Sequence, residues 1–350
     1  MLALGCTIAA PAPAPTGANR STAGSDSDVD GNAGPAAEPA QPSANRAGPA
    51  SSGSLQRITL GVPVKSLNFL PLYVGHDEGL FAAEGLEVEI VVMPAEVGMA
   101  GLVSGSLDYS AAGTAALRAA TNGVPVRALG FMSVQPTFYL MSKPNIRTLT
   151  DLRQKVIATS SLGSSGIEIA RIAVQRAGLD PQEDIQILPT GATANAYTAL
   201  VSGQVDAAVL SVPFNVQAEH DGFYPLLYAG DITSSPESGL ATSVDRLQAE
   251  PDQVTRMLRV MLRSVAYVRD HKPEVTERIA REFSVSQDLA DGAYETMLRS
   301  YSQNGEIVAT AIEDIIRTQR AEQGIAQEIT VGDVADFGPL RQAQRDLGLP

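Results

Sequence analysis

Hydroxyl, amide and aromatic side chains gather in several short stretches that each follow an apolar run. The richest stretch is 159–166, Thr-Ser-Ser-Leu-Gly-Ser-Ser-Gly, which directly precedes a helix-like segment. Hydroxyls and free backbone N–H groups at a helix start can bind an acceptor group, and a neighbouring aromatic ring can stack on a flat one. This chemistry suits the capture of a small polar molecule. The candidate binding residues are Asn68, Phe69, Ser110, Thr114, Phe138, Tyr139, Ser160, Ser164, Ser165, Thr190, Phe214 and Asn215.

Each of these positions also has a structural interpretation, which the residues alone leave open. A further carboxylate, Glu237, could meet a donor group of the ligand, but a solvated loop carboxylate is the expected role. The structural alternatives are core packing for Phe69, N-capping for Thr114, hinge packing for Phe138 and Tyr139, and a capping box for Ser165 with Glu168.

Residues for catalysis or metal binding are scarce. The three histidines show no metal-ligand spacing, and neither a Ser-His-Asp set nor a glycine-rich phosphate loop occurs. The single cysteine, Cys6, excludes an internal disulfide. The net charge is −14, from 25 basic and 39 acidic residues without a basic cluster, so nucleic acid is not an expected partner. We therefore predict no catalytic residue, no metal site and no cofactor.

Two matching seven-residue stretches indicate an internal duplication. LVSGSLD at 102–108 returns as LVSGQVD at 200–206, and each copy ends a helix-like run and opens a short apolar run. Gly105 and Gly203 stand where a helix C-terminus favours a residue without a Cβ. The repeat predicts the same helix–turn–strand unit in each of two α/β lobes, with a small molecule held between the lobes.

Strands alternate with helices through most of the chain, which is typical of parallel sheets joined by crossover helices. Ligands of such sheets bind beyond the carboxyl ends of the strands. From about 245 to 320 the pattern is helical, and its apolar stripe is expected to pack on the first lobe as core. The expected strands are 58–64, 86–92, 107–112, 125–132, 137–142, 155–159, 184–188, 205–210 and 224–229, with helices near 71–84, 95–104, 114–121, 165–177, 192–202 and 213–219.

The chain is expected to divide into a tail and two lobes. Residues 1–56 combine a truncated lipoprotein-signal end with a tether rich in Ala, Pro, Gly and Ser, a composition typical of disorder. We expect the first lobe at 57–143 plus 238–350 and the second at 144–237. Ala3-Leu4-Gly5-Cys6 resembles the end of a bacterial lipoprotein signal, which predicts a lipid on Cys6, although five preceding residues cannot hold a complete signal.

Several stretches resemble motifs of one protein family. They are Pro71–Gly75, Glu78–Phe81, Glu84–Val88, Thr148–Ile157, Gly163–Ser165 and Leu200–Val209. On these motifs the chain resembles the solute-binding proteins of ABC importers, in the nitrate/sulfonate/taurine branch that includes the NMT1/THI5-like thiamine-precursor binders. Gln154 departs from the glycine that is usual in the second-lobe motif.

The resemblance implies a type II periplasmic-binding-protein fold, α/β, with two lobes, a hinge and a central cleft. It also implies a monomer that binds a small molecule, is lipid-anchored outside the cytoplasm, and delivers its ligand to ABC permease and ATPase subunits. Because only Lys65 offers a cation in the candidate loops, and aromatic residues are frequent there, we expect a heteroaromatic vitamin or precursor such as riboflavin or a thiamine pyrimidine.

Three alternatives to this reading of the ligand and function stay open. The first is a binder of sulfonate, taurine or nitrate. The second is a THI5-like pyrimidine-synthesising enzyme, which in the family depends on a cysteine-rich motif and a histidine, whereas Cys6 is the only cysteine here. The third is a regulatory domain, which would carry a helix-turn-helix ahead of the lobes.

Overall fold

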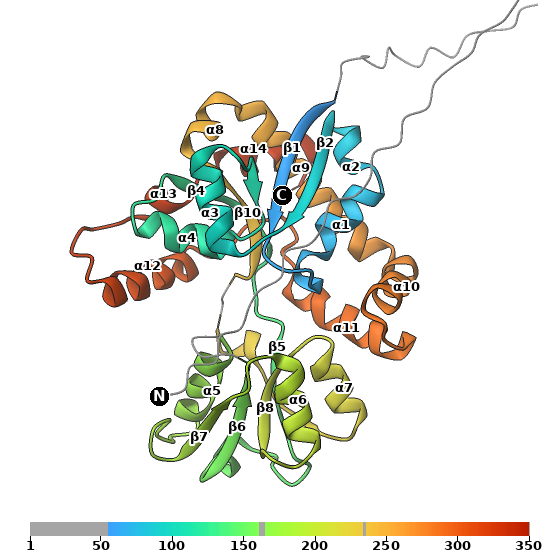
Figure 1. The fold of residues 1–350 in the computed structure, drawn as a ribbon, viewed down its shortest axis with the longest axis vertical. Coiled ribbons are helices and arrows are strands. Elements are labelled where there is room, and N and C mark those ends of the chain that lie inside the picture. The colour runs from blue at the N-terminus through green and yellow to red at the C-terminus, as the bar shows by residue number, and fades with distance from the viewer. Residues whose placement is uncertain (1–54, 161–164, 234–235, 350) are drawn as a thin grey trace, which may run out of the picture. The chain divides into compact units, whose positions relative to one another are not determined.

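Two five-stranded mixed sheets organise the protein in a computed structural model that describes residues 55–160, 165–233 and 236–349 (Figure 1). The first sheet has the order β2 (Leu86–Val92), β1 (Gln56–Val62), β3 (Tyr109–Ser110), β10 (Ser238–Ser243) and β4 (Val126–Ser133). The second has the order β7 (Ile185–Pro189), β6 (Lys155–Thr159), β8 (Ala207–Ser211), β5 (Phe138–Ser142) and β9 (Tyr224–Tyr228).

Both sheets follow one pattern, in which the fourth strand alone runs against the others. In the first sheet this strand is β10, antiparallel to β3 and β4, and in the second it is β5, antiparallel to β8 and β9. These are also the two strands by which the chain enters each sheet from the other. The expected two-lobed α/β fold of periplasmic binding proteins is confirmed.

Helices cover both faces of each sheet (Figure 1). Those of the second lobe are η2 (Leu149–Leu152), α5 (Ser165–Arg176), α6 (Thr193–Val201), α7 (Phe214–His220) and η3 (Ala229–Asp231). Those of the first lobe before the crossing are η1 (Leu67–Phe69), α1 (Leu70–Asp77), α2 (Leu80–Ala83), α3 (Ala95–Ser104) and α4 (Gly113–Thr121). The later ones are α8 (Val244–Ala249), α9 (Pro251–Asp270), α10 (Lys272–Phe283), α11 (Gln287–Ser300), α12 (Ala309–Gln323), α13 (Val331–Val334) and α14 (Gly338–Leu347).

Two strands differ from the sequence prediction. The apolar run 137–142 was expected in the first lobe, yet Phe138–Ser142 forms β5 and pairs with β8 and β9 in the second sheet. The run has the same apolar character in either sheet, so only its pairing with residues far along the chain decides the sheet. The strand β10 was not predicted, because Ser-Gly-Leu-Ala-Thr-Ser has one β-branched residue, Thr242, and no aromatic residue to mark a strand.

The predicted duplication is confirmed in three dimensions. Asp108 accepts a hydrogen bond at 2.7 Å from the N–H of Thr59 in β1, and Asp206 accepts one at 3.1 Å from the N–H of Val156 in β6. Gly105 and Gly203 both have positive φ, 75° and 78°, at the turn before each aspartate. The repeated motif therefore ends a helix and fastens the next strand to the sheet in the same way in each lobe.

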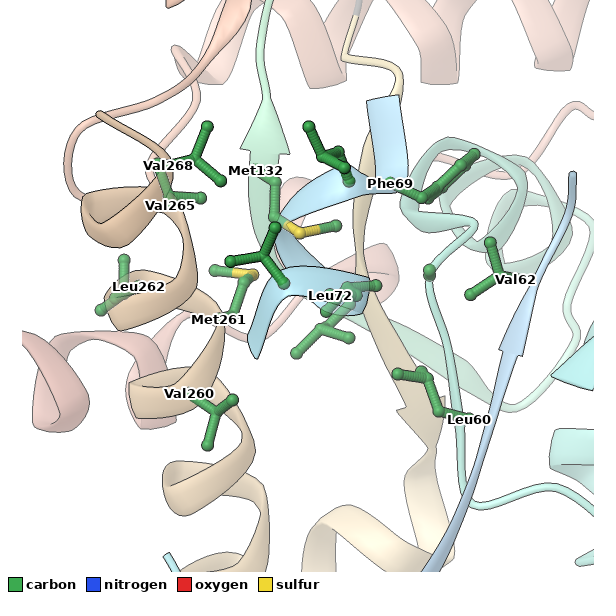
Figure 2. Packing of buried hydrophobic residues seen from close by; sticks show 14 of the residues in the cluster. Leu60, Val62, Phe69, Leu72, Met132, Val260, Met261, Leu262, Val265 and Val268 are labelled. Atoms are coloured by element: carbon green, nitrogen blue, oxygen red, sulfur yellow. The ribbon is translucent and has the colours of Figure 1, made fainter. Parts of the chain in front are cut away.

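The apolar stripe of α9 is confirmed as core of the first lobe. Figure 2 shows Met261 and Val265 of α9 near Leu72 of α1, with Met132 of β4 between the elements. Gly75 of α1 faces Ser264 of α9. A Cβ added at Gly75 would lie 2.1 Å from the Ser264 Oγ, so the glycine lets α1 and α9 approach closely. Each fully buried aliphatic side chain here stabilises the fold by roughly 1.5–3 kcal/mol. The stripe consists of Val254, Met257, Leu258, Met261, Leu262, Val265 and Val268.

Candidate ligand-binding site

The strand register brings the carboxyl edges of both sheets to the chain crossings. Phe138, the first residue of β5, pairs with Ser211, the last residue of β8. Likewise Ser238, the first residue of β10, pairs with Ser133, the last residue of β4. Because parallel strands end at one edge, the loops after the parallel strands of each lobe lie on the side where the crossings join.

A hydrogen-bonded cluster of three polar residues, which we call the junction cluster, lies at these crossings. Asn68 precedes α1, Thr137 ends the outward crossing, and Glu237 ends the return crossing. The Asn68 Nδ2 donates to Glu237 Oε2 at 2.5 Å, and the Thr137 Oγ1 donates to Asn68 Oδ1 at 3.4 Å. Thr137 is buried, whereas Asn68 and Glu237 keep part of their surface exposed.

The Glu237 carboxyl is electrostatically unusual. Burial raises the pKa of Glu237 to about 7, against hydrogen bonds from Asn68 and Thr137 that lower it. The expectation of a solvated loop carboxylate is therefore wrong, because tertiary packing of two crossings and η1 withdraws Glu237 from water. A carboxyl with a strongly shifted pKa and an accessible surface is a candidate contact for a ligand.

Thr114 lies beside this cluster on the first lobe, and Ser110 lies at the end of β3, in the turn before α4. The Thr114 Oγ1 donates to the Pro236 carbonyl oxygen at 2.5 Å, next to Glu237. Thr114 is not the N-cap of α4, since the helix begins at Gly113 and Ala112 occupies the cap position. Ser110 is 2% exposed and its Oγ accepts from the Ala112 N–H at 3.2 Å, so its hydroxyl organises the turn.

An aromatic pair lies at the hinge ends of the second-lobe strands. The Tyr139 and Tyr228 ring centroids are 4.9 Å apart at 38°, and the Arg299 guanidinium of α11 lies 4.1 Å from the Tyr228 centroid. Arg299 also donates to the Tyr139 hydroxyl at 2.9 Å. The Tyr228 hydroxyl donates at 3.5 Å to the Oε1 of Gln135 in the outward crossing, two residues before Thr137 of the junction cluster.

The second lobe contributes hydroxyl-bearing loops after β6 and β7. The Ser160 carbonyl accepts from the N–H groups of Thr190 and Gly191, at 2.9 and 2.6 Å, and the Thr190 Oγ1 donates to the Thr159 carbonyl at 2.9 Å. The Thr159 Oγ1 is buried and has no hydrogen-bond partner among the described residues. Ser165 is exposed as the first residue of α5, and the predicted Ser164 lies outside the described residues.

Phe214 of α7 lies in a different place from the junction cluster. Its ring is 5.7 Å from that of Tyr197, and both line a pocket of about 210 Å³ that also contains Val285 and Leu289 of the first lobe. Phe214 therefore faces the seam between α6–α7 and the α10–α11 turn. A larger pocket of about 520 Å³ lies among α4, α8 and the 325–333 segment, away from every predicted residue.

Three predicted binding residues are buried or pack against a core. Phe69 is 5% exposed and packs in the first-lobe core (Figure 2), so its ring is not free to stack on a ligand. Phe138 packs against the core cluster on the α5 face of the second sheet. Asn215 is 4% exposed, although its Oδ1 has no partner among the described residues.

The sequence analysis missed Arg299, which is the cation nearest the aromatic pair. Lys65, the one cation expected in the site, instead pairs with Glu282 at 3.4 Å. Arg299 and Tyr139 are 160 positions apart, so no local pattern could join them. No group of three or more His, Cys, Asp or Glu side chains in the described part of the chain is placed to hold a metal ion. Within the same residues, no helix is long and apolar enough to cross a membrane.

The comparisons with known proteins agree with this architecture. The riboflavin-binding protein RibY of Chloroflexus aurantiacus is 27% identical over 244 residues, which cover 66% of this chain and 67% of RibY. The structure of the periplasmic sulfonate-binding protein SsuA from Methylobacillus flagellatus KT superposes with a TM-score of 0.67 and 17% identity, over 85% of this chain and 96% of SsuA. The desulfurization enzyme DSZB superposes with a TM-score of 0.59 and 16% identity, over 83% of this chain and 99% of DSZB.

The fold is that of the periplasmic solute-binding proteins of ABC importers. The family described as NMT1/THI5 like matches residues 66–275, and the chain belongs to that family. Most of the similar proteins are binding proteins, while DSZB shows that an enzyme also uses this fold.

Proposed function

We propose that the protein captures a flat, hydrogen-bond-donating heteroaromatic nutrient for an ABC importer, with riboflavin or a thiamine pyrimidine as the ligand. The ligand lies between the carboxyl edges of the two sheets, contacts both lobes, and is enclosed when they close about the crossings. The loaded form then delivers the ligand to permease and ATPase subunits. The observation that carries this proposal is the partly buried Glu237 carboxyl, held by Asn68 at the meeting point of the crossings.

The chemistry of Glu237 favours a ligand that donates hydrogen bonds. An ionised carboxylate only accepts, and Asn68 already uses one of its oxygens. The imide N–H of a flavin or the amino group of a pyrimidine supplies a donor on a flat ring. The half-buried ring of Tyr139, next to the cluster, supplies aromatic surface for such a ring, while Tyr228, which is 5% exposed, packs against Tyr139. The family relationship and the similarity to RibY support the same class of ligand.

Small anions fit the junction cluster less well. A nitrate or alkanesulfonate beside Glu237 would meet a group of like charge, and the nearby Arg299 already has Asp231 within 3.8 Å. Taurine is the alternative that the site supports best, because its ammonium would suit Glu237, while its sulfonate would compete with Asp231 for Arg299. The two classes of ligand are therefore separable by experiment.

A ligand screen tests the proposal directly. We expect riboflavin or 4-amino-5-hydroxymethyl-2-methylpyrimidine to raise the melting temperature of the purified protein, since a ligand that binds only the folded state stabilises it. Riboflavin binding is confirmed by quenching of flavin fluorescence, and native mass spectrometry identifies any ligand that co-purifies. A rise with taurine, ethanesulfonate or nitrate, and none with the vitamins, would refute the heteroaromatic ligand. Recovery of a chemically altered vitamin after incubation would support the enzyme instead.

We also propose that a lipid on Cys6 anchors the protein at the outer face of the cell membrane, although Cys6 lies outside the described residues. Lipoproteins carry several acyl chains, and two or more chains give stable anchoring where one does not. We expect the full-length protein, expressed with a complete lipoprotein signal, to fractionate with membranes. The Cys6→Ser variant is expected in the soluble extracytoplasmic fraction. Equal membrane association of both proteins would contradict lipidation as the anchor.

A further inference from the structure

A single arginine of the first lobe makes three contacts with the second. Arg299, near the end of α11, donates to the Tyr139 hydroxyl at 2.9 Å and stacks over the Tyr228 ring at 4.1 Å. Its second amino group lies 3.8 Å from Asp231 of η3. The Asp231 contact is exposed and contributes little, so the cation–π contact with Tyr228 and the hydrogen bond to Tyr139 dominate.

Both tyrosines stay neutral and available to Arg299 across the physiological range. Burial raises the pKa of Tyr139, against the nearby Arg299, which lowers it. Burial also raises the pKa of Tyr228 to about 12, again against Arg299. The Tyr139 hydroxyl therefore accepts from the guanidinium, and the Tyr228 ring offers its face.

The position of these contacts along the chain is informative. Tyr139 is the second residue of β5, directly after the outward crossing, and Tyr228 is the last residue of β9, directly before the return. When two lobes rotate about their crossings, atoms near the crossings move least. A contact made at this place persists through such a rotation, whereas contacts at the outer rims break.

We propose that Arg299 is a positioning residue that ties the hinge ends of β5 and β9 to the first lobe. It adds a noncovalent connection to the two chain crossings and so restricts the angles that the lobes sample. This restriction of the lobe angles does not depend on a bound ligand. The effect of Arg299 on ligand affinity, by contrast, rests on the proposed function.

Gly292, two turns earlier on α11, supports the same contact surface. A Cβ added at Gly292 would lie 2.5 Å from Val216 Cγ1 of α7, so only glycine allows α7 to approach this closely. The contact of α11 with the second lobe thus extends along one helix from Gly292, which lies against α7, to Arg299, which lies against β5 and β9. A larger residue at Gly292 would push α7 away while it leaves the arginine intact.

Distance measurements between spin labels test the proposal. Because Cys6 is the only cysteine, Cys6→Ser gives a cysteine-free background, and labels go on the exposed positions Gln182 of the second lobe and Gln323 of the first. In double electron–electron resonance without ligand, Arg299→Ala is expected to broaden the distance distribution. Gly292→Val is expected to shift its mean. Arg299→Lys keeps the charge but not the planar guanidinium group, so a distance distribution of intermediate breadth is expected.

The control for lost charge is Arg317→Ala, which removes an exposed arginine whose partner, Asp314, lies on the same helix. With riboflavin as the probe, Arg299→Ala is expected to raise the Kd by roughly three- to tenfold, while Arg317→Ala leaves it unchanged.

A spin-label distance distribution for Arg299→Ala that is identical to that of Arg317→Ala overturns the proposal. So does a lowered melting temperature without any broadening, which marks a merely structural residue. Absence of riboflavin binding by every protein excludes riboflavin as the ligand but leaves the test of Arg299 intact, since the distances still report on Arg299.

Discussion

The Glu237→Gln variant is expected to bind riboflavin about 10- to 100-fold more weakly than the wild type at pH 8. Glutamine keeps the shape of the side chain but removes its charge, and a hydrogen bond to a charged group is worth about 1.5–3 kcal/mol. Asn68, which donates to Glu237 at 2.5 Å, still finds an acceptor in the glutamine oxygen, so the fold is retained. Titration by flavin fluorescence at fixed ionic strength measures the change.

The matched control is Glu277→Gln on α10, which removes one negative charge from an exposed residue. We expect this control to bind as the wild type does. Equal affinities of the wild type and both variants would exclude Glu237 as a ligand contact. A loss of affinity in both variants would mean that net charge, and not the carboxyl of Glu237, controls binding.

The pH dependence follows from the same group. The pKa of Glu237 is raised from 4.5 to about 7 in the folded protein without ligand, chiefly by burial. Its contribution to the free energy of unfolding is therefore complete below pH 4.5 and is lost as the pH rises through 7. Between pH 5 and 8, the stability of the ligand-free wild type should fall relative to Glu237→Gln by on the order of 1–3 kcal/mol.

Ligand affinity should move in the opposite direction with pH. The acceptor for the ligand N–H is the ionised carboxylate, so riboflavin binding to the wild type should strengthen as the pH rises from 5.5 to 8. Glu237→Gln should show neither trend. A general loss of structure would lower stability and affinity together, so opposite pH trends in these two quantities indicate an effect of Glu237 itself. A wild-type affinity that does not change with pH would contradict the role of Glu237.

Local patterns predict the elements of this fold well because each element depends on its own residues. The strand 155–159 and the helix starting at 165 match the structure. The duplication at 102–108 and 200–206 predicts two lobes, since each copy performs the same turn. By contrast, β10 is recognisable only from its pairing with β3 and β4.

The candidate site is less predictable because its residues come together only in three dimensions. Asn68 and Glu237 are 169 positions apart, and the loop sequence around Glu237 resembles any exposed turn. Phe69 is indistinguishable from a stacking residue until the core around α1 is known. Sequence analysis finds loops at the strand ends, whereas the structure decides which side chains there remain accessible.

The Asp108→Ala variant is expected to lose about 2–4 kcal/mol in the free energy of unfolding, the largest stability effect we predict. Asp108 accepts from the Thr59 N–H at 2.7 Å and pairs with Arg246, which also donates to Gln253 at 2.9 Å. The Gln253 Oε1 in turn accepts from Tyr109, and both of these residues are buried. Loss of the carboxylate leaves the Thr59 N–H without its acceptor. It also leaves the largely buried Arg246 guanidinium without its anionic partner, although the hydrogen bond to Gln253 remains. Urea denaturation followed by circular dichroism measures the loss.

The duplication provides the matched control within the same chain. Asp206 occupies the equivalent position in the second lobe, where it accepts from the Val156 N–H at 3.1 Å and pairs with Lys143 at 3.0 Å. Burial alone would raise the pKa of Asp206, but these two bonds hold it below its usual value, so Asp206 also stabilises its lobe. Lys143 also donates to the exposed Gly203 carbonyl at 3.3 Å and reaches no buried side chain among the described residues, so Asp206→Ala should cost only about 1–2 kcal/mol. Equal losses for the two variants would show that the strand N–H bond alone sets the energy and that the Arg246 network adds nothing.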